Sequence, residues 1–261
     1  MIILDGAMGT ELYKRGYTGD TALANVSAFS HVAEIHRAYL EAGSTVLTAN
    51  TFSAYPHKHK NFAELINKGI EAARTAGGNR VFHNLGPTGL ILEPYGDSTD
   101  DELFEIFSQA AAAGADADGY LIETMMDLRE LEIAVRAAAQ FNKPIYATMT
   151  FNENGKTMYG NSIKDLCDAL KDTGAVIGMN CGFGPEAYLP LVDEMALYAE
   201  SIILQPNAGL PVVLSDGTTE YTLGPADFAQ IMLRAKDKAD ILGGCCGTTP
   251  EHIRAMVELC K

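Results

Sequence analysis

The sequence alternates eight times between a short apolar run and a longer amphipathic segment, and no other feature constrains its fold as strongly. The apolar runs read MIILD, STVLTAN, NRVFHNLG, GYLIET, PIYATMT, AVIGMNC, SIILQPNAG and DILGGCC. Short apolar runs bounded by turn-forming residues are typical of β-strands that are buried on both faces. We therefore expect eight buried strands.

The segments between these runs repeat apolar residues at positions i, i+3, i+4 and i+7, as helices buried on one side require. They read VAEIHRAYLEAG, FAELINKGIEAART, DELFEIFSQAAAAG, LRELEIAVRAAAQ, IKDLCDALKDTG, EAYLPLVDEMALYA, PADFAQIMLRAKDKA and TTPEHIRAMVELC. Gly43, Gly114 and Gly174 end three of them, and glycine is the usual residue for a left-handed helix terminus. In the last segment a threonine caps the helix and Pro250 lies in its first turn.

Eight strand–helix units in 261 residues predict an α/β protein with a single-domain (β/α)8 TIM barrel over residues 1–261. A doubly wound open sheet is the alternative, but such sheets usually have fewer strands and leave edges exposed. In a barrel, functional residues gather where the strands end. Those ends are far more polar than the strand bodies, and they carry Asp5, Asn50, Asn84, Glu123, Thr150, Cys181, Asn207, Cys245 and Cys246.

The charge balance excludes some classes of partner. The chain has 19 basic and 34 acidic side chains, a formal net charge of −15, which repels nucleic acid and anionic lipid. No segment is apolar for the roughly 18 residues that a membrane span needs. The first residues, MIILDGAMGT, lack the basic region of a signal peptide, and five cysteines are an odd number. We expect a cytoplasmic protein whose cysteines bind metal or do chemistry.

Two of the cysteines continue apolar helix faces and are expected in the core: Cys167 and Cys260. The other three end strands. Cys181 lies in GMNCGFGP, whereas Cys245 and Cys246 lie in GGCCGT. Neighbouring side chains of a strand point to opposite faces, so the flanking glycines are needed to let both adjacent thiols reach one point. Because strand ends share one barrel mouth, we expect the three thiols to converge.

Three converging thiolates suit a tetrahedral zinc ion whose fourth position stays open for chemistry. The alternatives are a chance trio of core cysteines or a redox disulfide, although a vicinal disulfide is strained and no C-x-x-C pair is present. Zinc with three thiolates activates water poorly but keeps an incoming thiol deprotonated. The site is therefore expected to activate a substrate thiol for attack on an electrophilic carbon.

Several motifs carry a family resemblance over essentially the whole chain: LDGAMGTEL, TANTF, LIETMMDL, TMTF, GKTMYG, GMNCGFGP, QPNAGLP and GGCCGTTPEHI. The chain resembles the homocysteine S-methyltransferase family, and most closely the homocysteine-binding module of cobalamin-dependent methionine synthases. The resemblance implies zinc held by Cys181, Cys245 and Cys246, which would act as the catalytic cysteines. It also implies methyl transfer to the thiol of homocysteine, giving methionine.

The resemblance implies roles for further residues at the strand ends. Asp5 and Glu123 would hold the α-ammonium of homocysteine; taken alone, Asp5 also reads as a turn residue and Glu123 as a helix N-terminal acid. Asn207 would supply a fourth zinc ligand when substrate is absent. The other residues implied to bind substrate are Gly6, Ala7, Met8 and Gly9, whose N–H groups would receive the carboxylate, and Asn50 and Thr51, which would line the pocket. Ala49 replaces a polar residue common in the family.

The motifs indicate the thiol that receives the methyl group more clearly than the donor that supplies it. Methionine synthases of this type continue into pterin, cobalamin and activation modules that have no counterpart in these residues, so the expected donor is a separate methylated corrinoid protein. The alternatives are S-methylmethionine or betaine as donor, another small thiol or a selenol as acceptor, or a non-catalytic module that binds zinc and homocysteine.

Two other motifs have weaker functional interpretations. The loop GPTG at residues 86–89 would suit a phosphate, but the GGCCGTTP loop, near the usual phosphate position of barrels, has no basic residue beside it. His57 and His59 could bind metal, yet their alternation in a polar loop favours a surface location.

Overall fold

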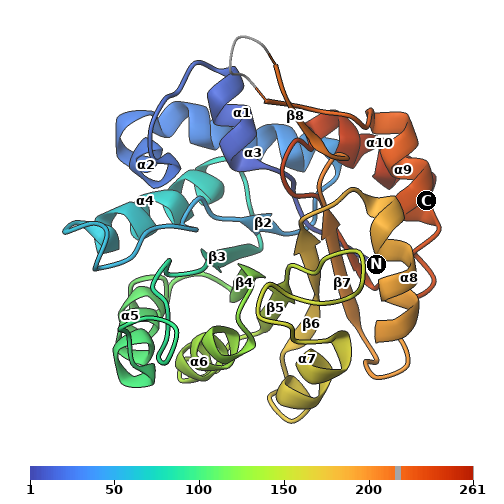
Figure 1. Cartoon of the computed structure of the whole chain (residues 1–261). Helices are drawn as coiled ribbons and strands as arrows, with labels where there is room; N and C mark the ends of the chain where they lie inside the picture. Colours follow the sequence, from blue (N-terminus) through green and yellow to red (C-terminus); the bar gives the residue numbers. More distant parts are fainter. Residues whose placement is uncertain (215–218, 261) are drawn as a thin grey trace.

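The computed structural model describes residues 1–214 and 219–260, and within them eight parallel strands form one curved sheet with helices around it (Figure 1). Neighbouring strands follow the order β1-β10-β7-β6-β5-β4-β3-β2. Their bounds are β1 Ile2–Ile3, β2 Leu47–Thr48, β3 Val81–Leu85, β4 Gly119–Met125, β5 Ile145–Met149, β6 Val176–Cys181, β7 Ile202–Pro206 and β10 Ile241–Leu242. The predicted TIM-barrel architecture is confirmed.

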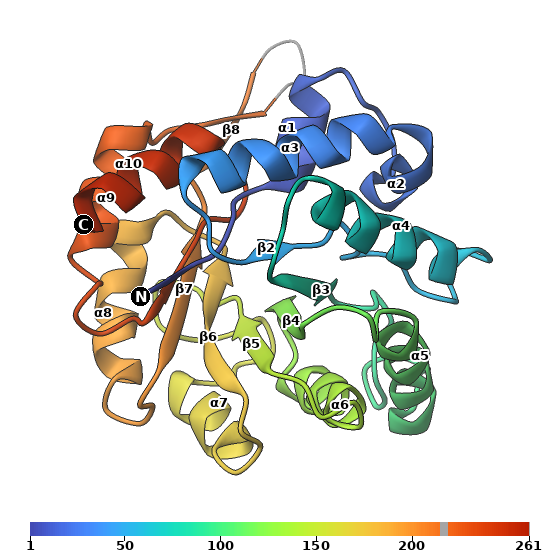
Figure 2. The ribbon, with the colours of Figure 1, turned by 180° about the vertical axis from the view of Figure 1, so that it is seen from behind.

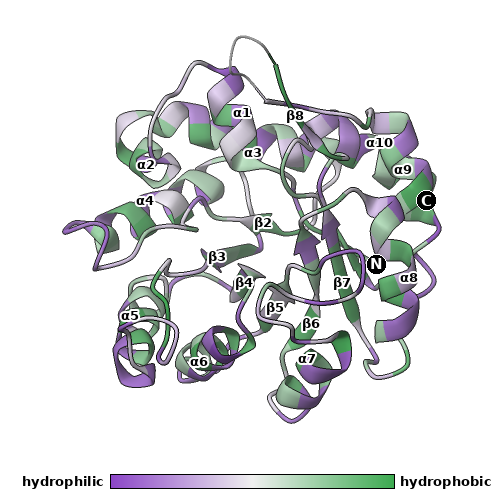
Figure 3. Cartoon of the chain, in the orientation of Figure 1, coloured by the Kyte–Doolittle hydropathy of each residue, from purple (hydrophilic) through white to green (hydrophobic). Residues whose placement is uncertain are grey.

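The helices between successive strands cover the outside of the sheet, as both views of the ribbon show (Figure 2). They are α3 Phe29–Ala42, α4 Phe62–Thr75, α5 Asp100–Ala113, α6 Leu128–Ala139, α7 Ile163–Leu170, α8 Pro185–Met195, α9 Pro225–Leu233 and α10 Pro250–Cys260. Hydrophobic residues fill the strands and the inner helix faces, whereas hydrophilic residues face outward (Figure 3). In the part of the chain that the structure describes, no helix is both long and apolar enough to cross a membrane.

The seam between β1 and β2 is joined by separate hydrogen bonds rather than by a regular ladder. The N–H groups of Thr45 and Val46 donate to the Ile3 carbonyl over 2.8 and 3.2 Å. One step further along, the Asp5 carboxylate accepts from the Thr48 N–H at 2.8 Å. A side chain predicted to bind substrate therefore also helps to join the first strand to the second.

Two insertions between strands and helices were not expected. After β1 the chain forms α1 (Met8–Lys14), the 3₁₀ helix η1 (Thr21–Leu23) and α2 (Ala24–Ser27) before it reaches α3. After β7 it forms an antiparallel pair, β8 (Pro211–Val213) and β9 (Thr219–Tyr221), before α9. Both insertions follow the carboxyl end of a strand, the side of a barrel where functional sites lie.

The three glycines predicted to end helices differ in conformation. Gly43 is left-handed, with φ +110°, and Gly174 also has positive φ but lies beyond the end of α7. Gly114 ends α5 as predicted, but its conformation is not left-handed, because its φ is −94°. Glycine is needed there for space, since a Cβ atom would lie 2.3 Å from the ring of buried His83.

Candidate metal and substrate site

Three cysteine thiols meet at the carboxyl ends of two strands. Cys181 is the last residue of β6, whereas Cys245 and Cys246 follow β10. Their sulfur atoms all lie within 4.8 Å of one another, the Cys245 and Cys246 sulfurs are 4.0 Å apart, and all three residues are partly buried. A tetrahedral zinc ion with Zn–S bonds of about 2.3 Å would place its sulfurs about 3.8 Å apart. The cluster could therefore bind a metal ion without large rearrangement.

Unusual backbone conformations bring these thiols together. Cys181 has φ +61°, a conformation that non-glycine residues rarely adopt, and its carbonyl accepts a 2.9 Å hydrogen bond from the Tyr188 hydroxyl. The chain turns after Cys245, whose carbonyl accepts from the N–H and the hydroxyl of Thr248. Gly247 permits this turn with φ +80°, and a Cβ atom there would lie 2.1 Å from the Tyr221 ring. The turn takes the two neighbouring thiols out of strand geometry.

Charge is unevenly shared within the cluster. Hydrogen bonds from Cys181 and from Cys245 lower the pKa of the Cys246 thiol. Hydrogen bonding to Cys181 and then to Cys246 raises the pKa of Cys245. One thiolate is thus stabilised at the expense of its neighbours, because like charges at this distance repel. A bound cation would allow all three thiols to ionise.

Asp5 follows β1 and is almost fully buried. Burial raises the pKa of its carboxyl to about 7, although the Thr48 N–H donates to it. His36 lies 3.8 Å away, but burial lowers the pKa of its imidazole to about 3, so this neighbour is neutral and supplies no compensating charge. A carboxylate in this setting favours a cationic ligand.

Glu123 is held by two amides beneath the same mouth. The Asn84 side chain donates to one carboxylate oxygen at 2.6 Å, and the Asn180 side chain donates to the other at 3.2 Å. Burial raises the pKa of this carboxyl to about 7 as well. The structure thus has a buried acid, Asp5, and a partly buried one, Glu123, at strand ends, each with a raised pKa. An ammonium group would stabilise their ionised forms.

Asn207 lies directly after β7, beside the strand that ends at Cys181. Its N–H donates to the Phe183 carbonyl, and the next N–H, of Ala208, donates to the Cys246 carbonyl. Its buried side-chain oxygen has no hydrogen-bond partner among the described residues. Because buried acceptors are rarely left unpaired, this oxygen is available to a ligand or a cation.

The segment from Gly6 to Gly9 is tied to the cysteine turn. The Ala7 N–H donates to the Thr248 hydroxyl at 3.2 Å, although 241 residues separate the two in sequence. The Tyr39 hydroxyl contacts the carbonyls of both residues, at 2.9 and 3.1 Å. Helix α1 starts directly after Ala7, and no side chain caps its N-terminus. Its first N–H groups are suited to an anionic group.

Asn50 and Thr51 have their polar atoms engaged inside the protein. The Asn50 amide donates to the Thr21 carbonyl and to the Asn25 side chain, over 2.7 and 2.8 Å. The Thr51 hydroxyl bonds to His83 and to the Asn84 backbone, each at 2.9 Å. These residues hold the η1–α2 insertion and the end of β3 in place, and the structure does not bring their polar groups to the thiols.

Sequence reasoning missed the role of Asn180. This residue precedes Cys181, is fully buried and contacts both Glu123 and Cys245. It also missed Thr248 and Tyr221, which border the cysteine turn. One feature of the sequence could have indicated this role: Asn180 is a polar residue within an apolar strand, and a buried amide needs several hydrogen-bond partners.

The two weaker motifs are structural. Both donors of Thr88 in the GPTG loop are taken by Glu130, whose carboxylate accepts from the N–H at 2.8 Å and from the hydroxyl at 2.6 Å. A carboxylate at this position repels phosphate. His59 contacts Asp20 at 3.0 Å, and His57 contacts the Thr88 carbonyl at 3.0 Å. The two histidines thus have different partners.

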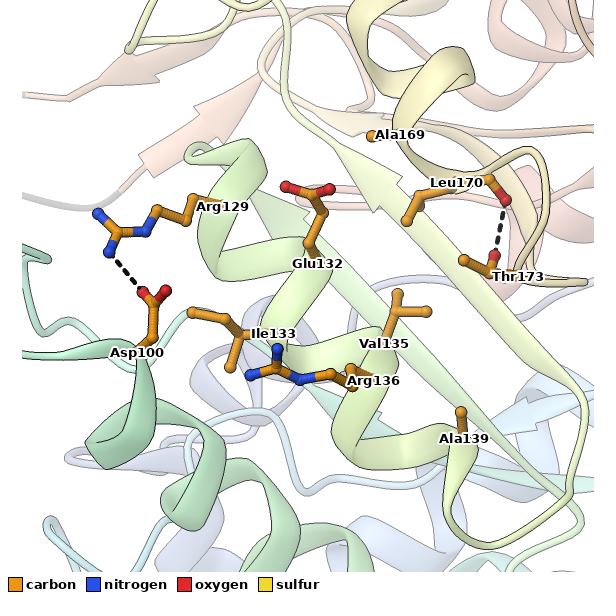
Figure 4. Close-up of a pocket in the computed structure, with 10 residues that line it drawn as sticks. All are labelled: Asp100, Arg129, Glu132, Ile133, Val135, Arg136, Ala139, Ala169, Leu170 and Thr173. Atoms are coloured by element: carbon orange, nitrogen blue, oxygen red, sulfur yellow. Dashed lines mark hydrogen bonds and ion pairs between the residues drawn. The ribbon is translucent and has the colours of Figure 1, made fainter.

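A groove of about 500 Å³ lies elsewhere, on the outside of the barrel (Figure 4). Helix α6 forms its floor, with Ile133 and Val135, and Leu170 of α7 lies at its side. An ion pair of 2.8 Å between Arg129 and Asp100 closes one end. Its ten lining residues include no cysteine or histidine, so it lacks the chemistry found at the strand ends.

The chain is similar over nearly its whole length to named proteins. Residues 2–260 match the family described as homocysteine S-methyltransferase. The methionine synthases of Mycobacterium tuberculosis and Mycobacterium leprae are each 30% identical over 288 residues, which cover 97% of this chain and 24% of those proteins. The chain thus spans about a quarter of the length of these relatives.

Solved structures share the fold. The apo form of the homocysteine methyltransferase MmuM from Escherichia coli has a TM-score of 0.80 at 22% identity, and the match covers 99% of this chain and 95% of that one. The metallated form of MmuM also has a TM-score of 0.80, at 21% identity, over 98% of this chain and 95% of that one.

Proposed function

The chain belongs to the homocysteine S-methyltransferase family, and from this premise we propose that it transfers a methyl group to the thiol of homocysteine, giving methionine. One observation carries the proposal: a cluster of three thiols lies at the same end of the barrel as the buried carboxylate of Asp5 and the partly buried carboxylate of Glu123. Homocysteine carries a thiol and an ammonium group that match these two features.

The amino-acid end of the substrate binds through Asp5, Glu123 and the start of α1. The two carboxylates hold the ammonium. Its positive charge stabilises their ionised forms, which burial disfavours and which the neutral His36 does not compensate. The substrate carboxylate binds the N–H groups of residues 6–9 other than that of Ala7, which donates to the Thr248 hydroxyl; those at the start of α1 have no side-chain cap. These contacts fix the direction in which the substrate sulfur points.

The metal in this proposal is zinc, held by Cys181, Cys245 and Cys246. The sulfur spacing supports it, and so does the unpartnered Asn207 oxygen, which would be the fourth ligand in the absence of substrate. When bound, zinc supplies a way to keep the substrate thiol deprotonated at neutral pH. The chain's thiolates leave the site rich in electrons, which keeps the substrate sulfur nucleophilic.

The reaction is an in-line displacement at the methyl carbon. A bond forms between the substrate sulfur and the methyl group while the bond between methyl and donor breaks, and its electron pair stays with the donor. The thiol proton leaves to solvent. Because Asp5 and Glu123 anchor the substrate, proximity and orientation supply much of the rate.

The proposed donor is a methylated corrinoid protein that docks over the barrel mouth. Support comes from seven exposed hydrophobic side chains in the connections after β3, β5 and β7, here called the apolar rim: Ile91, Tyr95, Met158, Tyr159, Leu210, Val212 and Val213. The rings of Tyr95 and Tyr159 lie 6.2 Å apart, so two of these connections meet. Exposed apolar clusters of this kind mark interaction surfaces.

The test combines metal analysis with an assay of methionine formation. Zinc content is measured first, and turnover of homocysteine is then assayed with methylcobalamin, betaine and S-methylmethionine. Cys246→Ala is expected to lose zinc and to reduce turnover at least about a hundredfold, because a three-thiolate site with one ligand removed holds the metal poorly. The matched control is Cys260→Ala, since Cys260 lies at the end of α10.

Two outcomes would overturn the proposal in different ways. If Cys246→Ala keeps both its metal and its full turnover, the cluster is not the reaction centre. If the wild-type protein binds zinc and homocysteine but turns over with none of the donors, it is a binding module rather than an enzyme.

A further inference from the structure

The side-chain amide of Asn180 is the meeting point of the thiol cluster and the carboxylate site. Its nitrogen lies 3.2 Å from a Glu123 carboxylate oxygen and 3.9 Å from the Cys245 sulfur. The same nitrogen donates to the Thr124 hydroxyl at 2.8 Å. Asn180 is fully buried, so these contacts have no competition from bulk water.

The amide oxygen fixes the orientation of this group. It accepts from the Thr124 N–H and from the Thr148 hydroxyl, both at 2.8 Å. With two acceptor bonds on one side, the amide cannot turn without breaking both of them. Its two N–H groups are therefore directed at Thr124, Glu123 and Cys245.

The backbone around Asn180 is strained on both sides of this contact. Thr124, which follows Glu123, and Cys181, which follows Asn180, both have φ +61°. Positive φ is uncommon for any non-glycine residue and is an outlier for a β-branched threonine. Such conformations persist only where the surroundings hold them, and they concentrate at functional sites. Here the Asn180 amide holds Thr124 through both its N–H and its hydroxyl.

We propose that Asn180 is a positioning residue that fixes the spacing between Glu123 and the thiol cluster, and that this spacing selects homocysteine over cysteine. The inference rests on the proposed function. A substrate must place its ammonium at Glu123 and its sulfur at the cluster at the same time. Cysteine is one methylene shorter and cannot satisfy both ends of a rigid site, whereas a site of adjustable spacing would accept either thiol.

The experiment compares binding of homocysteine and cysteine to zinc-loaded protein by calorimetry. Asn180→Ala removes all the contacts of the Asn180 side-chain amide with Glu123, Thr124, Thr148 and Cys245. The ratio of homocysteine affinity to cysteine affinity is expected to fall about tenfold or more, because one methylene in a fitted pocket is worth 10- to 200-fold. Most of the loss should lie in homocysteine affinity, and zinc content should change less than the ratio.

Thr148→Val provides the matched control. It removes one buried hydrogen bond to the Asn180 oxygen but leaves the contacts of the nitrogen with Glu123 and Cys245 in place. This variant should lose stability yet keep the affinity ratio within about twofold. An equal fall of the ratio in both variants would mean that general loosening, not the amide bridge, controls selectivity.

A second variant and a ligand series keep the inference testable if Asn180→Ala does not fold. Thr124→Gly replaces a constrained residue with φ +61° directly after Glu123 by one that moves freely there, so the Glu123 carboxylate loses its fixed position and the ratio should also fall. In the wild-type protein, affinity for ω-thiol amino acids of increasing chain length should peak sharply at homocysteine. A flat series would overturn the role of Asn180 while leaving the proposed function intact, whereas absence of any homocysteine binding would overturn the proposed function itself.

Discussion

Among the residues that the structure describes, neither Asp5 nor Glu123 contacts a charged group of opposite sign. Asp5 is bonded by one backbone N–H and faces a neutral imidazole, and Glu123 is bonded by two amides. Burial raises the pKa of both carboxyls to about 7, because it penalises the charged form more than these dipoles stabilise it. Near neutral pH each acid is therefore only partly ionised, and an ammonium ligand shifts it to the charged state.

Ligand binding should consequently weaken as pH falls through 7. Below that value the free protein holds protons on these carboxyls, and the ammonium must displace them before it can bind. Methionine, the proposed product, is the ligand of choice, because it has no thiol proton whose loss would add to the effect. Its affinity, measured by calorimetry, is expected to fall between pH 7 and pH 5 by up to about tenfold per pH unit for each carboxyl that must lose its proton.

The control for this prediction is Asp5→Asn. The variant should bind methionine more weakly at pH 8 and should show a smaller change between pH 8 and pH 5, since one titrating group is gone. An affinity for methionine that stays constant over this range in the wild-type protein would mean that neither carboxyl meets the ammonium.

At the scale of elements, helix α5 packs against β3 with no spare room at one point. Gly114 follows α5, and a Cβ atom there would lie 2.3 Å from the ring of His83 in β3. That ring is fully buried and hydrogen-bonded to Thr51 and to the Ala110 carbonyl, at 2.9 and 3.2 Å. The contact therefore fixes the distance between the helix end and the strand that supplies Asn84.

Gly114→Ala should accordingly destabilise the protein by about 1–3 kcal/mol, the usual cost of overpacking. Its φ of −94° suits alanine, so the loss comes from the contact with His83 and not from backbone strain. Chemical denaturation measures the effect. Gly9→Ala is the control, because its nearest neighbour would lie at 3.6 Å and it should leave stability unchanged or raise it. Equal stability of the two variants would show that α5 shifts freely.

Elements with buried faces could be predicted from the sequence, and elements without them could not. All eight apolar runs contain a strand because each is almost entirely buried. The β8–β9 hairpin was missed because its two strands have only three residues each and are exposed or partly buried, so they show no alternation of buried and exposed positions. The apolar residues of β8 are therefore not a sign of burial. Helix α1 was missed because it is short, with two buried residues, Glu11 and Leu12.

The candidate site shows the same division. The thiols and acids at strand ends were predictable, because a barrel brings those ends to one mouth. The engagement of Asn50 by Thr21 and Asn25 was not, because its partners lie in the unpredicted η1–α2 insertion. Asn180 was equally hidden, since its role depends on the backbone conformations at Thr124 and Cys181, and a sequence does not display these.

At the scale of the whole molecule, the site depends on joining the two ends of the chain. Strand β1 pairs with β10, and this pairing puts Asp5 next to the turn that carries Cys245 and Cys246. Glu123 and Cys181 come from β4 and β6 in the middle of the sheet. In the proposed reaction, a methyl donor would therefore approach from the mouth, across the connections that carry the apolar rim.

The apolar rim should therefore be needed for a protein-bound donor and not for a free one. In Tyr95→Asp/Val213→Asp, two side chains that are 79% and 72% exposed become charged. The KM for the methylcobalamin-loaded cobalamin module of a methionine synthase should rise about tenfold or more, because two apolar contacts are replaced by charges and loss of the dominant residues of an interface costs about 2 kcal/mol or more. Turnover with free methylcobalamin should stay within about twofold.

Leu197→Asp/Tyr198→Asp is the control, since it adds the same charge on exposed apolar residues between α8 and β7, at the opposite end of the barrel. If both double variants raise KM equally, added negative charge explains the effect. If neither does, the donor protein approaches by another route.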